Sequence, residues 1–171
     1  MIASIQEFLS YFASIRKRTL TFCRAVPEEL IDWAPRPGEY TFGDIIRHLA
    51  ASEQMFTGVA VADRWEYPGH ERSLGPTLSD ALFFLDSTHT TALATIGALS
   101  DADLQAPRAV IGEGSIAVWR ILMLMIEHEV HHRSQIAEYI SANGREPPQI
   151  YGLKIEEVMA YTESAMARSV G

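Results

Sequence analysis

Helix-start signals recur along this chain and constrain its fold more than any other feature. A Ser or Thr followed three residues later by an acidic residue is typical of a helix N-terminus, because each side chain can accept a hydrogen bond from the other residue's backbone N–H. The pair Thr41–Asp44 is also flanked by Tyr40 and Ile45, which suit a hydrophobic staple. Helices are therefore expected to begin at four such pairs: Ser4–Glu7, Thr41–Asp44, Thr77–Asp80 and Ser100–Asp103.

Apolar residues between these starts repeat at the three- and four-residue spacing of amphipathic helices. No segment alternates polar and apolar residues convincingly enough to predict a strand. Asn143–Gly144, followed by Pro147–Pro148, provides a helix stop. The sequence therefore predicts an all-α fold, a four-helix bundle with an additional C-terminal helix, in one domain over 1–171. The expected long helices cover about 4–26, 41–62, 77–99, 115–143 and 154–167.

Composition narrows the class of protein. The formal net charge is −8 and Arg16–Arg18 is the main basic run, so nucleic-acid binding is disfavoured. No apolar run approaches the roughly 18 residues that a membrane span needs, and the N-terminus lacks the basic start of a secretory signal. Cys23 is the single cysteine, which excludes an intrachain disulfide and favours a cytoplasmic location.

The chemistry is expected in the segment 128–135, where three histidines fall within five residues of an otherwise apolar helix. His128 and His132 lie about 40° apart round a helix and roughly 6 Å apart along it, so both rings can reach one cation. Ile121 and Tyr139 share their face, which therefore points inward. His131 lies about 60° away, so a pair of His128 with His131 is an alternative.

A third ligand is best supplied by His48, which lies on an apolar stretch of the second helix. His70 falls in an expected loop and His89 has polar neighbours, so these two and His131 are interpreted as surface or supporting groups. Three imidazoles buried without partners would cost roughly 1–3 kcal/mol for each unsatisfied atom, whereas one cation satisfies all three. This comparison favours a metal site over a set of core histidines.

Four further residues near the histidines are candidates for roles in the same site. Glu53 and Glu129 are the carboxylates that could act as a general base. Arg133 and Gln135 could orient the ligands or a substrate.

Residues 128–132 also match the H-E-x-x-H pattern of zinc proteases, in which Glu129 would activate water. The extended pattern of one large protease group requires Gly at 135 and His at 138, where this chain has Gln135 and Glu138. No strand is predicted that could hold a peptide substrate. The protease is therefore the less favoured interpretation.

Three stretches of the chain resemble the DinB/YfiT-like superfamily of four-helix-bundle metalloenzymes. They are the Pro/Gly segment leading into a helix with an early His (35–50), the run His128 to Gln135, similar to H-x-x-x-H-R-G-Q, and the link Val26–Leu30. Ser134 stands where the family usually has Gly. The resemblance implies His48, His128 and His132 as metal ligands, the set that the helical wheel also favours. It further implies a homodimer.

Three neutral histidines leave a coordination position open, and they favour Zn²⁺ or Ni²⁺ over Fe²⁺ or Mn²⁺. By the resemblance, the expected function is a thiol-dependent S-transferase, using a low-molecular-weight thiol, or a hydrolase, in either case acting on a small molecule. A non-catalytic, stress-related binding or dimerisation module is the alternative.

The positions of the ligands within their helices predict a topology. His48 lies about 10 Å from the start of its helix and His132 about 15 Å from the end of its own, so antiparallel helices would bring them to similar depth. The second and third helices could then be parallel, joined by a crossover at 63–76 in an up-down-down-up bundle.

Overall fold

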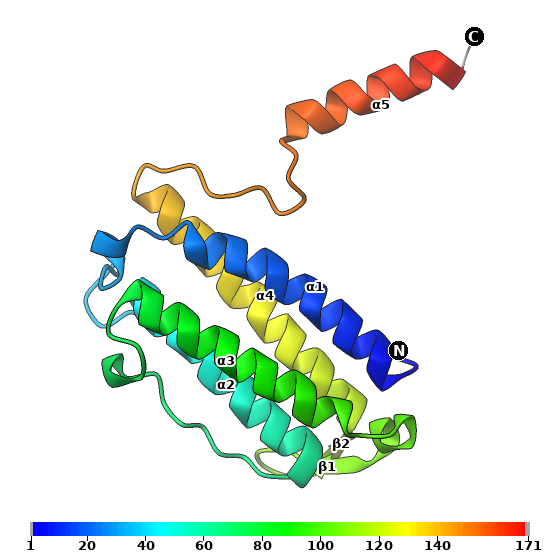
Figure 1. The fold of residues 1–171 in the computed structure, drawn as a ribbon. Coiled ribbons are helices and arrows are strands. Elements are labelled where there is room, and N and C mark those ends of the chain that lie inside the picture. Colours follow the sequence, from blue (N-terminus) through cyan, green and yellow to red (C-terminus); the bar gives the residue numbers. More distant parts are fainter. Residues whose placement is uncertain (1, 170–171) are drawn as a thin grey trace.

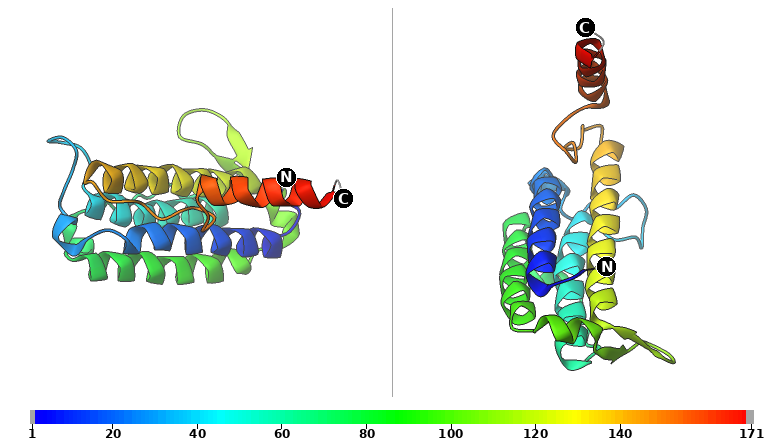
Figure 2. Two further views of the ribbon diagram at one scale, coloured as in Figure 1. Left: turned by 90° about the horizontal axis from the view of Figure 1, so that it is seen from above. Right: turned by 90° about the vertical axis from the view of Figure 1, so that its right-hand side faces the viewer.

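The computed structural model of the protein describes residues 2–169, apart from the side chains of residues 164 and 167–169. Four long helices form a bundle: α1 (Ile5–Arg24), α2 (Phe42–Ala62), α3 (Leu78–Gly97) and α4 (Val118–Ala142) (Figure 1). Short 3₁₀ helices occupy the connections at η1 (Glu28–Leu30), η2 (Arg72–Leu74) and η3 (Asp101–Gln105). A fifth helix, α5 (Ile155–Ser169), stands clear of the bundle in Figure 1 and in the right-hand view of Figure 2. The predicted all-α class is confirmed.

The local start signals act as expected. The Thr41 side chain accepts a hydrogen bond from the backbone N–H of Asp44, whose carboxylate accepts one from the N–H of Thr41. Ser100 and Asp103 form the same reciprocal box at η3. Ser4 and Thr77 cap α1 and α3 through their side-chain oxygens. These caps fix where the helices begin and therefore the depth of each side chain in the bundle.

The bundle has the predicted up-down-down-up topology. Figure 1 shows α2 and α3 running in the same direction, joined by the crossover 63–76, which returns along the length of the bundle. Helix α2 packs against α3 and α4, while α1 packs against α4 and α3. Because α4 runs opposite to α2, residues early in α2 face residues late in α4.

The sequence prediction was wrong about strands. Pro107–Ala109 (β1) and Ser115–Ala117 (β2) pair as a small antiparallel hairpin, with Arg108 opposite Ile116. Helix α4 therefore begins at Val118 and not near Ser115. Strands of three residues are too short to display a readable alternation of polar and apolar side chains.

The core consists of two apolar clusters, one toward each end of the bundle. Between them lies a buried ionic cluster to which each bundle helix contributes one residue: Arg16, Glu53, His89 and Glu129. Cys23 belongs to one apolar cluster, and burial raises the pKa of its thiol to about 12, as expected of a packed cysteine. None of the described helices has both the length and the apolar character needed to cross a membrane.

Candidate metal centre

Three histidines from two antiparallel helices converge on one point. His48 lies in the second turn of α2, and His128 and His132 lie one turn apart on α4. Their potential ligand atoms all lie within 4.8 Å of one another. The Nε2 atoms of His48 and His128 are 3.0 Å apart, and the ring centroids of His128 and His132 are 4.4 Å apart. The structure therefore brings together all three predicted ligands.

The spacing of these nitrogens suits a small divalent cation. Tetrahedral zinc at about 2.0–2.1 Å from each nitrogen places two ligand nitrogens roughly 3.3 Å apart. The 3.0 Å between His48 and His128 would widen by only a few tenths of an ångström to reach that separation. The donor set of three imidazoles is also one that zinc and nickel accept. The residues present fit such a cation.

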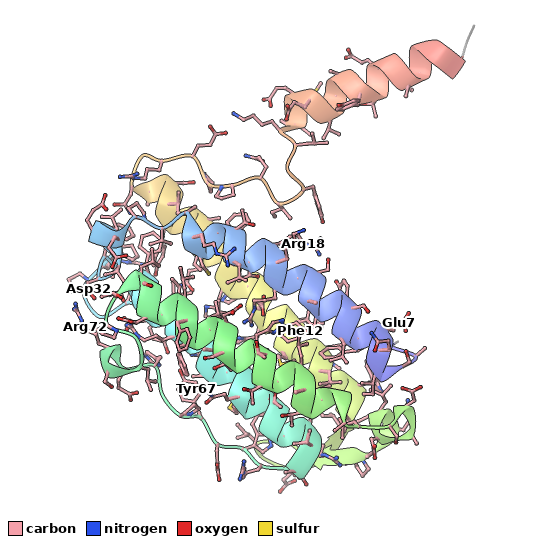
Figure 3. All side chains as sticks on the ribbon, viewed as in Figure 1. Glu7, Phe12, Arg18, Asp32, Tyr67 and Arg72 are labelled. Atoms are coloured by element: carbon pink, nitrogen blue, oxygen red, sulfur yellow. The ribbon has the colours of Figure 1, made fainter. Side chains whose placement is uncertain are left out.

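Hydrogen bonds to Nδ1 orient two of the three rings, those of His48 and His132. The Tyr67 hydroxyl, on the crossover, lies 2.7 Å from Nδ1 of His48 and 2.7 Å from Nδ1 of His70 (Figure 3 labels Tyr67). If Nε2 of His48 binds a cation, its Nδ1–H donates to the Tyr67 oxygen, and the Tyr67 hydroxyl can donate to His70. A single direction of hydrogen bonding thus fits the whole chain of contacts.

Gln135 contacts Nδ1 of His132 as Tyr67 contacts Nδ1 of His48. Its Oε1 lies 2.9 Å from Nδ1 of His132, and its Nε2 donates to the Tyr139 hydroxyl at 3.2 Å. The amide oxygen can accept only from a protonated Nδ1, which leaves Nε2 of His132 as the ligand atom. Gln135, which was predicted to orient the ligands or a substrate, thus lies against one of the three histidines.

The electrostatic setting keeps the three imidazoles neutral. Burial, aided by His132 and His70, lowers the pKa of His48 to about 4. Burial and the neighbouring histidines lower the pKa of His128 to about 3. Burial also lowers the pKa of His132, against the raising effect of its hydrogen bond with Gln135. Neutral imidazole is the form that binds metal ions, so the site is prepared for a cation at neutral pH.

The structure places Glu53 and Glu129 in the ionic cluster and not against the three histidines. Arg16 donates to both carboxylates, from Nη2 to Glu53 Oε2 at 2.7 Å and to Glu129 Oε2 at 2.7 Å. The second oxygen of Glu53 lies 2.8 Å from Nδ1 of His89. His89 is only 8% exposed, so its interpretation as a surface or supporting group of the metal site was wrong. Although burial alone would lower the pKa of Arg16, the two carboxylates raise it overall.

Arg133 and His131 also lie away from the point where the ligands converge. The Arg133 side chain is buried and lines a small cavity together with Phe22 of α1 and Val130 of α4. It lies about 100° from His132 round the helix. His131 is exposed, and its ring packs against that of His132 with centroids 4.9 Å apart.

Two contributors to the site and its support, Tyr67 and Arg16, were not predicted. Tyr67 lies in a segment without periodicity, so nothing in the pattern indicates that it reaches His48. His70, which was interpreted as a surface or supporting group, lies in the same segment and contacts the Tyr67 hydroxyl. Arg16 did leave a signal, because it follows Phe12 by four residues and so shares the inward face of α1. A charged residue at such a position indicates a buried ionic partner.

The chain is similar to known proteins over most of its length. The chain matches the model of the DinB superfamily over residues 11–136. It is 26% identical to the protein YrdA of Bacillus subtilis over 161 residues, which cover 92% of this chain and 93% of that protein.

Solved structures share the fold. A DinB-like protein from Bacillus cereus superposes with a TM-score of 0.72 at 19% identity, covering 87% of this chain and 99% of that one. A DinB-like protein from Bacillus subtilis gives a TM-score of 0.69 at 18% identity, covering 84% of this chain and 96% of its own. At these identities the likeness establishes a common architecture.

Proposed function

The chain belongs to the DinB superfamily, and from that premise we propose that it is a metal-dependent enzyme whose divalent cation is bound by His48, His128 and His132. The observation that carries this proposal is the convergence of the three side chains within 4.8 Å. The contacts of His48 with Tyr67 and of His132 with Gln135 support it, because they orient the rings before a cation binds.

The ligand set favours Zn²⁺ or Ni²⁺, since Fe²⁺ and Mn²⁺ more often take a carboxylate ligand. Three protein ligands leave a coordination position open, as in catalytic zinc sites. Glu53 and Glu129 do not close that position, because Arg16 binds both carboxylates. A cation held there would supply Lewis acidity to a thiol, a water or a substrate oxygen.

We further propose that the reaction is a thiol-dependent S-transfer or a hydrolysis of a small molecule. In the first case a low-molecular-weight thiol is the co-substrate. A groove of about 520 Å³ reaches Tyr67 and is lined by polar groups that include Gln54, Arg64 and Glu66. Its size and polarity suit a small polar substrate better than a protein chain.

The contacts of Glu53 and Glu129 with Arg16 argue against the general-base role first predicted for these carboxylates. Removing a proton from a substrate requires a carboxylate within about 3 Å of it, whereas the Glu129 oxygens lie 2.7–3.2 Å from Arg16 inside the bundle. We propose that Glu53 and Glu129 are positioning residues that fix α2 and α4, and that neither is a general base. The same contacts count against the protease, which needs Glu129 to activate water.

The decisive experiment is elemental analysis of the purified protein and of two single variants. We expect about one equivalent of zinc or nickel per chain in the wild type, lost in His132→Ala. The matched control is His131→Ala, which removes the adjacent exposed imidazole and should retain the metal. Retention in all three proteins would contradict the assigned ligands. A wild type without metal after supplementation would overturn the proposal and favour the non-catalytic module.

If metal is present, a titration with thiols separates the two reaction classes. A low-molecular-weight thiol that binds at the cation should perturb the absorption spectrum of the cobalt-substituted protein. Such a change supports the S-transferase, while its absence at millimolar thiol supports the hydrolase.

A further inference from the structure

The side of α4 opposite the metal ligands carries an apolar stripe. Trp119, Met123, Val130 and Ala137 lie about 180–220° from His128 round the helix, and all four are at least partly exposed. With neighbouring residues of α1 this stripe forms what we call the α1/α4 groove. It contains one cavity of about 360 Å³ at Phe8, Tyr11, Trp119 and Met123, and another of about 160 Å³ at Phe22, Val130, Arg133 and Ala137.

The groove contains a buried cation that lacks a full set of partners. Arg133 is 6% exposed, and among the described residues its Nη1 has no hydrogen-bond acceptor. The carboxylate closest in sequence, Glu129, is bound by Arg16. Arg18, labelled in Figure 3, adds a second positive charge on α1. A buried guanidinium with an unmet donor indicates that an acceptor, best an anion, completes this site when the surface is covered.

Helix α5 has the complementary surface. Ile155, Val158 and Met159 lie within about 60° of one axis on the helix, and they are 65%, 41% and 55% exposed. Glu156 and Glu163 border this apolar face on one side, about 80–100° from Ile155. An apolar stripe edged by carboxylates therefore matches an apolar groove that holds Arg133 and Arg18.

The lengths of the two surfaces are also comparable. The 15 residues of α5 span about 22 Å. On α4 the groove extends from Trp119 to Ala137, about 27 Å. One α5 helix would thus cover most of the groove, including the part at Arg133.

The chain's own α5 leaves this groove. Ile150 lines the smaller cavity and the Tyr151 ring lies 6.0 Å from the Arg18 guanidinium, so the connecting segment occupies one end of it. From there α5 extends away from the bundle in two views (Figures 1 and 2). We propose that the α1/α4 groove binds α5 of a second copy of this chain, in a reciprocal exchange that places a carboxylate of the incoming helix against Arg133. Exchange of identical elements is a low-cost route to a symmetric dimer.

Sedimentation velocity on matched variants tests the exchange. The variant Ile155→Gln with Met159→Gln alters two residues of the apolar face, and Ala160→Gln alters the opposite face of the same helix. We expect a dimer in the wild type and in the control, and a dimer Kd raised roughly tenfold or more in the double variant. Because α5 does not pack on its own bundle, neither variant should change the unfolding of the bundle at concentrations where the chain is monomeric. Where the wild type is dimeric, the double variant should unfold more readily, because it loses the stabilisation that a bound partner provides. A monomeric wild type, or a double variant that dimerises as tightly as the wild type, would overturn the proposal.

Cross-linking between copies distinguishes exchange from an α5 that folds back on its own bundle. One preparation carries Met159→Cys on α5, and a differently tagged one carries Ser134→Cys at the groove. The native Cys23 is fully buried and should not react. A bismaleimide should join the two tagged chains after mixing. If cross-links form only when both substitutions are on one chain, α5 folds back and the exchange is refuted.

Discussion

Arg16 of α1 and Glu129 of α4 form a buried ion pair, with Nη2 of the guanidinium 2.7 Å from Oε2 of the carboxylate. A second bond from Nε to Oε1, at 3.1 Å, makes the contact bidentate. Glu129 directly follows the metal-ligand candidate His128, about 100° further round the helix. The pair therefore fixes the rotation of α4 about its axis and with it the direction in which His128 and His132 point.

Replacing Arg16 by Met should destabilise the protein strongly. The substitution leaves the carboxylates of Glu53 and Glu129 buried without their cation, and breaking a buried pair in this way costs about 3–5 kcal/mol. The free energy of unfolding from urea titrations measures the loss. Lys17→Met, at the adjacent exposed position, should stay within about 0.5 kcal/mol of the wild type. A loss below about 1 kcal/mol for Arg16→Met would show that the ion pair does not hold the helices.

The depressed pKa values of the histidines predict a pH dependence for the metal-free protein. In the folded state the pKa of His48 is about 4 and that of His128 about 3, against roughly 6.5 in an unfolded chain. At a pH between the folded and unfolded pKa values, the unfolded state binds more protons than the folded state. The free energy of unfolding should therefore fall as the pH is lowered from about 6.5 toward 4. Urea titrations in the presence of a chelator, repeated across this range, measure the slope.

A substitution can isolate the contribution of His128 to the pH dependence of the free energy of unfolding. His128→Asn removes one depressed group and should flatten the decline below pH 6.5. His131→Asn, which alters the exposed neighbour, serves as the control. Identical slopes in the wild type and in His128→Asn would contradict the prediction.

Removing the Tyr67 hydroxyl should weaken metal binding without unfolding the bundle. Tyr67→Phe removes the oxygen 2.7 Å from Nδ1 of His48 and leaves only Ser52 Oγ, at 3.5 Å, near that nitrogen. The loss of such an orienting contact typically lowers metal affinity roughly 10- to 100-fold. Competition with a chromophoric chelator measures the change. Tyr40→Phe is the matched control, because the Tyr40 ring also packs against His48, with centroids 5.4 Å apart. Equal affinities for the two variants would show that the hydroxyl does not orient the ligand.

Local signals made the helices and the pair His128 and His132 predictable. The caps at Ser4, Thr41 and Thr77 are set by contacts within four residues, so the sequence alone indicates where α1, α2 and α3 begin. His128 and His132 are predictable for the same reason, because helical spacing places them on one face. Choosing His48 as the third ligand needed only its place on an apolar stretch, and its depth in the helix then predicted that α4 runs antiparallel to α2.

The features that could not be predicted depend on contacts between segments far apart in the sequence. Glu53 and Glu129 were expected beside a metal, but periodicity does not reveal that Arg16, 37 and 113 residues away, binds both. The hairpin of β1 and β2 depends on pairing between two three-residue strands, which leaves no pattern in either. Tyr67 reaches His48 because the crossover is held in place by residues elsewhere, and no spacing rule describes such a loop.

Arg47 is a buried residue that holds the crossover, and its loss should affect the metal centre at a distance. It is 1% exposed, and its guanidinium donates to the carbonyl oxygens of His70 and Gly75 at 2.9 and 2.8 Å. Arg47→Met should free this segment, lower the free energy of unfolding by about 2–3 kcal/mol, speed proteolysis within 63–76 and weaken metal binding through Tyr67. Arg72→Met is the control, since Arg72 pairs with Asp32 at an exposed site worth little. If Arg47→Met weakened metal binding no more than Arg72→Met, the crossover would not support the metal centre.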